Sequence, residues 1–215
     1  ESMFCIGSFL LYHQLRSRNS LCIFNKKIMA RTASNMVSLY TVAPNFNLLD
    51  TTSNQFKNLD ELTGEKGTVI FFICNHCPYV HHVIDEVVRI SNDFRVQGIN
   101  FVALSSNDII AYPEDAPELM TEFAIKHKFN FPYLYDESQK VAKQYDAACT
   151  PDFYLYNANR QLIYRGQIDD SRPQNGMVVS GADLRNAIDA LLSNKKILEE
   201  QKPSIGCNIK WKLVE

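Results

Sequence analysis

Two cysteines separated by two residues are the feature of this sequence with the clearest chemical meaning. Cys74 and Cys77 lie in the run FFICNHCPYV, which occupies residues 71–80. An apolar stretch of strand length precedes the pair, and a helix-like pattern follows it. The N-terminus of a helix carries a partial positive charge that stabilises a thiolate, the nucleophilic form of cysteine, and a protonated His76 would act in the same direction. The spacing therefore indicates thiol–disulfide chemistry.

The position of the helix start indicates which cysteine attacks. Proline is tolerated at the first helical position but not deeper in a helix, so Pro78 predicts a helix that begins there, with Cys77 at its N-cap. We therefore predict that Cys77 is the nucleophile and that Cys74, in the preceding turn, resolves its oxidised form. The reverse assignment stays open, because the first cysteine attacks in many C-x-x-C proteins.

A second motif, Cys149-Thr150-Pro151, precedes a predicted strand. Its Thr-Pro step is a candidate for a cis peptide bond, which is found at only about 5–6% of X-Pro bonds in folded proteins. Cys149 is either a second possible disulfide partner for Cys77 or an ordinary small buried side chain. The residues expected to support the cysteines are Thr150, Pro151, Pro78 and His76.

The same region also allows a binding function without catalysis. Cysteine and histidine side chains are ligands for zinc or Cu(I), and His81 lies one helical turn after Cys77. The alternative function is therefore a copper or zinc carrier with the ligands Cys74, His76, Cys77 and His81. A third possibility is an interaction module whose cysteines are inert.

The elements that must position these residues are indicated by the spacing of apolar side chains. Thr68–Ile73 is a continuous apolar run, typical of a central strand covered on both faces, and Val80–Phe94 has helical spacing. Further predicted strands are 43–49, 99–104, 132–135, 153–156 and 162–164, and further helices are 117–128, 138–145 and 183–192. Strands alternating with helices predict one α/β domain with a central mixed sheet flanked by helices.

Composition excludes some classes of function. The chain has 215 residues, a net charge of −2 and 46% hydrophobic residues, as expected for one globular domain. The near-neutral charge argues against nucleic-acid binding, and no apolar stretch approaches the roughly 18 residues of a membrane span. We therefore expect neither nucleic acid nor membrane as a partner, and a cytoplasmic location.

The two ends of the chain are expected to differ from its body. Residues 1–49 carry five basic side chains and one acid, whereas the remainder is acidic. Residues 1–35 are therefore predicted to be a disordered or non-native leader, organellar targeting by residues 1–28 being the less favoured alternative, and 36–215 to be the domain. Cys5 and Cys22 are given no role. The tail from about residue 199 is expected to be less regular, and Cys207 within it to be inert unless the tail has a function.

Taken together, these motifs resemble the thioredoxin-like superfamily in its AhpC/TSA (redoxin) branch, and especially a peroxiredoxin-like subgroup with the motif CNHCPYV. The likeness covers about residues 36–213 and includes three further stretches, Cys149–Phe153, Tyr164–Pro173 and Lys202–Trp211. It implies a thioredoxin-like fold, with Pro151 in a cis-proline loop that faces the redox cysteines. It also implies a thiol–disulfide oxidoreductase or a thiol-dependent antioxidant protein.

The resemblance also implies what the protein would react with. The substrate would be a thiol, a disulfide or a hydroperoxide, the electrons would come from a thiol donor such as a thioredoxin, and no cofactor is expected. Peroxiredoxins have Thr or Ser three residues before the attacking cysteine, where this chain has Cys74, and their activating Arg would fall near Thr150. Peroxidase activity is therefore left open. Thr68–Ile73 also lacks the buried acid that thioredoxins have near their cysteines.

Overall fold

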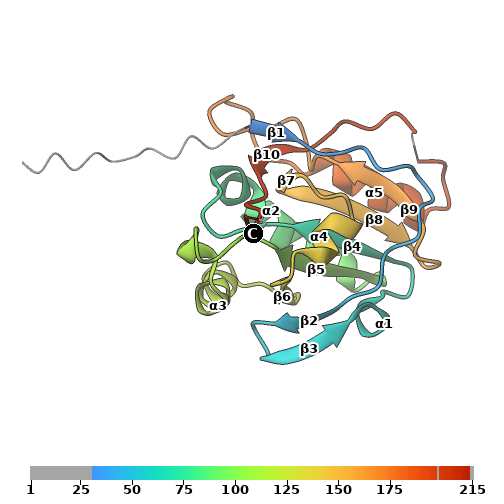
Figure 1. Cartoon of the computed structure of the whole chain (residues 1–215). Coiled ribbons are helices and arrows are strands. Elements are labelled where there is room, and N and C mark those ends of the chain that lie inside the picture. The colour runs from blue at the N-terminus through green and yellow to red at the C-terminus, as the bar shows by residue number, and fades with distance from the viewer. Residues whose placement is uncertain (1–30, 198, 214–215) are drawn as a thin grey trace, which may run out of the picture.

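A computed structural model describes residues 31–197 and 199–213 of the chain (Figure 1). Most of the expected leader, including Cys5 and Cys22, lies outside the described residues. The elements form a central sheet with helices on both faces, and a small second sheet at one end. The predicted α/β class with a mixed sheet flanked by helices is confirmed.

The central sheet has seven strands in the order β3-β2-β6-β5-β4-β8-β9. β4 lies near its middle, parallel to β5 and antiparallel to β8, which makes the sheet mixed. All six residues of β4 are buried, in agreement with the continuous apolar run of its sequence. The strands are β2 (Asn47–Asp50), β3 (Gln55–Asn58), β4 (Gly67–Phe72), β5 (Ile99–Ser105), β6 (Tyr133–Tyr135), β8 (Asp152–Asn157) and β9 (Leu162–Gly166).

Two hydrophobic cores lie on opposite faces of this sheet. Successive side chains of β4 alternate between them, with Val69 and Phe71 in the first core and Ile70 and Phe72 in the second. The first core is covered by α2 (Pro78–Arg95), α3 (Pro117–Lys126) and α5 (Ala182–Leu192). The second is covered by α1 (Leu59–Leu62) and α4 (Lys140–Gln144), and a short 3₁₀ helix, η1 (Pro113–Asp115), precedes α3.

The small sheet joins both ends of the described chain to its middle. Its order is β1 (Arg31–Ala33), β10 (Ile205–Asn208) and β7 (Cys149–Thr150), with both pairings antiparallel. The domain therefore includes residues 31–35, which the sequence analysis assigns to the leader, and the tail contains a regular strand. Both features depend on pairing between distant segments, which leaves no local apolar pattern to detect.

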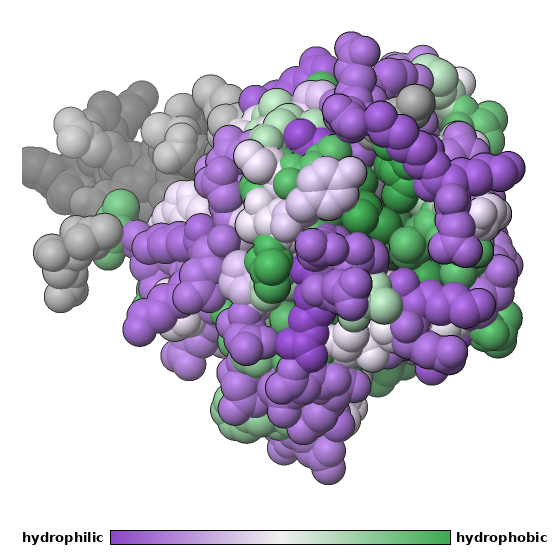
Figure 2. Space-filling model, turned by 90° about the vertical axis from the view of Figure 1, so that its right-hand side faces the viewer, coloured by the Kyte–Doolittle hydropathy of each residue, from purple (hydrophilic) through white to green (hydrophobic). Residues whose placement is uncertain are grey.

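The surface carries mostly hydrophilic side chains on the face shown in Figure 2, with hydrophobic areas visible in hollows between them. None of the helices in the described part of the chain is both long enough and apolar enough to cross a membrane.

Candidate redox site

The junction between β4 and α2 places Cys77 as the sequence predicts. Pro78 occupies the first turn of α2 and Cys77 is its N-cap, with an extended backbone (φ −76°, ψ 120°). The Cys77 side chain is fully buried. Its side chain therefore lies at the N-terminal end of an 18-residue helix, where the first backbone N–H groups carry a partial positive charge.

A sulfur atom from the tail of the chain lies next to that of Cys77. The Sγ atoms of Cys77 and Cys207 are 2.7 Å apart, not far beyond the ~2.05 Å of a disulfide bond. Cys207 stands on β10 and is as buried as Cys77. From the sequence, Cys207 is expected to be inert unless the tail has a function. The contact could not be predicted from spacing, because 130 positions separate the two cysteines. The only signal was the likeness of the tail around Cys207 to that of a known subgroup.

The Thr150–Pro151 loop contacts both cysteines of the motif. Its peptide bond is cis, the isomer considered from the Thr-Pro step. The carbonyl oxygen of Thr150 lies 3.2 Å from the Cys77 sulfur, and its hydroxyl lies 3.4 Å from the Cys74 sulfur. Cys149 is also buried, and its thiol donates weakly to the carbonyl oxygen of Pro151 at 3.7 Å. The loop thus brings Thr150 and Pro151 to the site, as expected.

The surroundings of Cys77 favour its thiolate. Burial by itself raises the pKa of the Cys77 thiol, but its interactions with the side chains of Cys207, Cys74 and Thr150 and with the Val80 backbone outweigh burial and lower the pKa well below the usual thiol value. Burial raises the pKa of Cys74, and the neighbouring Cys77 and the Asp115 carboxylate raise it further. Burial likewise raises the pKa of Cys149. Of these three thiols, that of Cys77 is the one whose pKa is lowered.

A buried carboxylate that sequence reasoning missed lies next to the motif. Asp115, the last residue of η1, is fully buried and accepts a hydrogen bond from the backbone N–H of Asn75 at 2.8 Å. Nδ1 of His76 lies 2.8 Å from the same carboxylate, and the His76 ring stacks on Tyr112. His76 therefore contacts Asp115, and its support of the Cys77 thiolate stays a prediction. The acid comes from η1, outside Thr68–Ile73, so a search of the strand could not find it.

The four predicted metal ligands do not form one cluster. Among the described residues, the set that gathers is Cys74, His76 and Asp115, whose ligand atoms lie within 4.8 Å of one another. His81 is exposed and packs against Phe123 instead. Both oxygens of Asp115 already accept hydrogen bonds, one of them from the Asn107 side chain at 2.7 Å. The arrangement supplies no four-ligand set of the kind that zinc prefers.

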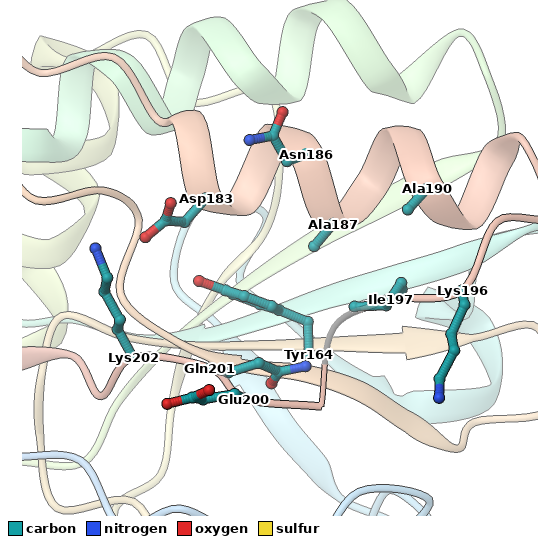
Figure 3. Close-up of a pocket in the computed structure, with 10 residues that line it drawn as sticks. All are labelled: Tyr164, Asp183, Asn186, Ala187, Ala190, Lys196, Ile197, Glu200, Gln201 and Lys202. Carbon is teal, nitrogen blue, oxygen red and sulfur yellow. The ribbon is translucent and has the colours of Figure 1, made fainter.

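A cavity of about 260 Å³ lies elsewhere, between α5, β9 and residues 196–197 and 200–202. Figure 3 shows the Tyr164 ring lying beneath α5, with Asp183 and Lys202 at one end of the cavity and Lys196 at the other. None of its lining residues is a cysteine, so the cavity is separate from the cysteine cluster.

Comparison with known proteins identifies relatives along most of the chain. The AhpC/TSA family matches residues 40–165. A crystal structure of an uncharacterized conserved protein from Geobacillus kaustophilus is 51% identical, with a TM-score of 0.85 over 87% of this chain and 99% of that one. A hypothetical protein from Sinorhizobium meliloti 1021 is 45% identical, with a TM-score of 0.82 over 84% and 98%.

More distant structures share the fold alone. A secreted disulfide oxidoreductase from Mycobacterium tuberculosis is 17% identical, with a TM-score of 0.53 over 67% of this chain and 95% of that one. The peroxidoxin BcpB of the same organism is also 17% identical, with a TM-score of 0.55 over 73% and 97%. A search of curated proteins finds no match to the chain. The thioredoxin-like fold implied by the sequence motifs is confirmed.

Proposed function

The chain belongs to the AhpC/TSA family, and from this premise we propose that it is a thiol–disulfide oxidoreductase whose nucleophile is the Cys77 thiolate. The observation that carries the proposal is the position of Cys77, at the start of α2 with a second thiol 2.7 Å from its sulfur. Hydrogen bonds lower the pKa of this thiol in spite of its burial, which supports a thiolate at neutral pH.

The proposed reaction is thiol–disulfide exchange. The Cys77 thiolate attacks one sulfur of a substrate disulfide, a mixed disulfide forms at Cys77, and the other half of the substrate leaves as a thiolate. A second cysteine of the chain then displaces the remaining half of the substrate. An external dithiol, such as a thioredoxin, restores the two thiols. A hydroperoxide would instead convert Cys77 to a sulfenic acid, which a second cysteine can resolve in the same way.

Turnover measurements on matched cysteine variants test this proposal. The full chain would be assayed with oxidised glutathione and, separately, hydrogen peroxide, with a thioredoxin and its reductase as the electron source. We expect Cys77→Ser to reduce the rate to the uncatalysed background, because serine provides no thiolate. Cys149→Ser is the matched control, since it changes another buried cysteine whose pKa is raised, and it should stay within about twofold of the wild type. A Cys77→Ser protein with wild-type turnover on both substrates would contradict the proposal.

A further inference from the structure

The backbone of the C-terminal strand is held against the residue that contacts Cys77. In β10, Cys207 is paired with Thr150 of β7 on one side and with Arg31 of β1 on the other. Thr150 is the residue whose carbonyl oxygen lies 3.2 Å from the Cys77 sulfur. β10 also contacts α2 (Figure 1). One short segment of backbone therefore sets the positions of both sulfur atoms.

Close packing on the N-terminal side of Cys207 holds this strand in place. A Cβ atom at Gly206 would lie 1.9 Å from the carbonyl oxygen of Thr150, so β10 approaches the loop as closely as a glycine allows. The Ser204 hydroxyl donates to the carbonyl oxygen of Pro151 at 2.6 Å. The backbone N–H of Ser204 donates to the hydroxyl of Ser34 at 2.8 Å. These contacts fix the strand that presents Cys207 and leave its sulfur little freedom to move away from Cys77.

We propose that Cys207 is the resolving cysteine of this protein, and that oxidation produces a Cys77–Cys207 disulfide joining the start of α2 to the C-terminal strand. This inference rests on the proposed function of Cys77 as the nucleophile. It replaces Cys74, the partner expected from the C-x-x-C spacing, and Cys149, the partner considered from its place beside the cis-proline loop, with a residue that only the fold brings to the site.

The resolving step balances without any group beyond the substrate. After the first attack, Cys77 forms a mixed disulfide with half of the substrate. The Cys207 sulfur attacks Sγ of Cys77, the new S–S bond forms as the bond to the substrate breaks, and the departing thiolate takes up the proton lost by Cys207. Two electrons have then passed from two protein thiols to the substrate disulfide, which leaves as two thiols.

The surroundings of the two candidate thiols respond differently to the first step. The pKa of Cys207 is raised first by its hydrogen bond to the Cys77 sulfur and then by burial. The first of these causes disappears once Cys77 has become a neutral mixed disulfide. The pKa of Cys74 is raised mainly by burial, which persists through that step, then by its hydrogen bond to Cys77, which is lost, and by Asp115, which remains. Reaction at Cys77 therefore activates Cys207 more than Cys74.

Disulfide mapping by mass spectrometry tests the proposal directly. The reduced chain, in a Cys5→Ser, Cys22→Ser background, would be treated with one equivalent of oxidised glutathione, alkylated and digested. We expect a Cys77–Cys207 peptide as the main product, and the same peptide from the Cys74→Ser and Cys149→Ser variants. The Cys207→Ser variant should accumulate glutathione on Cys77 and turn over at least about tenfold more slowly, because only its second step is lost.

The possible outcomes separate this inference from the proposed function. A Cys74–Cys77 or Cys77–Cys149 peptide as the main wild-type product would by itself overturn the role of Cys207, as would normal turnover by Cys207→Ser, and either result would leave Cys77 as the nucleophile. Normal turnover by Cys77→Ser would overturn the proposed function itself. The wild-type map needs no variant, so the inference can be refuted even if Cys207→Ser fails to fold.

Discussion

Cys74 and Cys207 are the two thiols that interact with Cys77, and their surroundings differ. Cys74 lies on the same loop as Cys77, with its sulfur 3.4 Å from the Thr150 hydroxyl and close to the buried carboxylate of Asp115. Cys207 is brought from the far end of the chain to 2.7 Å from the Cys77 sulfur. The pKa values of both thiols are raised, that of Cys74 mainly by burial and that of Cys207 first by its hydrogen bond to Cys77. We propose that the remote thiol is the one that reacts with Cys77. Under this proposal, proximity along the chain is a poor guide to the redox partner.

The same difference bears on access to the site. Cys77 is fully buried, and the strand that carries Cys207 belongs to the sheet beside it. A substrate therefore needs at least a local opening of the structure to reach the Cys77 sulfur. Mutations can weaken the pairing between β10 and β7, and such variants test whether this strand positions Cys207.

Replacing Gly206 by Ala should have the largest effect on the placement of Cys207 beside Cys77. The new Cβ would overlap the Thr150 carbonyl at 1.9 Å, so β10 must shift away from the loop. We expect the free energy of unfolding to fall by about 2–3 kcal/mol, as in other overpacked sites, and the yield of Cys77–Cys207 disulfide to drop. Chemical denaturation and peptide mapping measure the two effects.

Gly176→Ala is the control for Gly206→Ala. Gly176 has a positive φ of 74° and nothing within 4 Å of an added Cβ, so this variant carries only the backbone cost of about 1–2 kcal/mol. Its disulfide yield should equal that of the wild type. Equal disulfide yields from both variants would show that the close packing at Gly206 does not position Cys207.

Removing the charge of Asp115 should change the reactivity of Cys74. Asp115→Asn takes away a carboxylate that raises the pKa of Cys74, so that pKa should fall and more Cys74 thiolate should be present at neutral pH. In a Cys207→Ser background we expect a few-fold faster formation of the Cys74–Cys77 disulfide.

Asp85→Asn is the matched control for Asp115→Asn, because Asp85 is an exposed acid on α2 that pairs with His127. This variant should leave the rate of Cys74–Cys77 disulfide formation unchanged. The same rate in the Asp115→Asn protein would mean that the carboxylate does not hold Cys74 in its protonated form.

Ser204→Ala should produce the smallest change. It removes the buried hydroxyl that donates to the Pro151 carbonyl at 2.6 Å, a loss of about 1 kcal/mol in unfolding free energy. Ser193→Ala, at an exposed position after α5, should be neutral. If the two variants unfold at the same denaturant concentration, this bond does not help to hold β10 on the loop.

Local patterns explain which parts of the molecule were predictable. The apolar run of β4 and the helical spacing of α2 identify elements whose burial is determined within a few residues, and Pro78 marks the helix start by its own stereochemistry. The position of Cys77 at the start of α2 and the cis-proline loop follow from these signals together with the resemblance they support.

The parts of the molecule that could not be predicted from the sequence depend on pairing between distant segments. Arg31–Ala33 and Ile205–Asn208 are short and become strands only because each pairs with a distant segment. Asp115 reaches Asn75 from 40 positions away, on a 3₁₀ helix that no periodicity marks. The contact of Cys207 with Cys77 was unpredictable for the same reason, because it depends on the pairing of β10 with β7, which residue spacing does not reveal.

The central claim is that Cys77 is a thiolate in the folded protein, and its ultraviolet absorbance tests this most directly. Thiolates absorb where thiols do not, so the difference between the wild-type and Cys77→Ser spectra follows the charge of this sulfur without requiring access to it. Because hydrogen bonds lower the pKa of Cys77, the difference should stay constant as the pH falls from 8 to about 5, well below the ~8.5 of a free thiol. A difference that disappears around pH 8–9 would contradict the account.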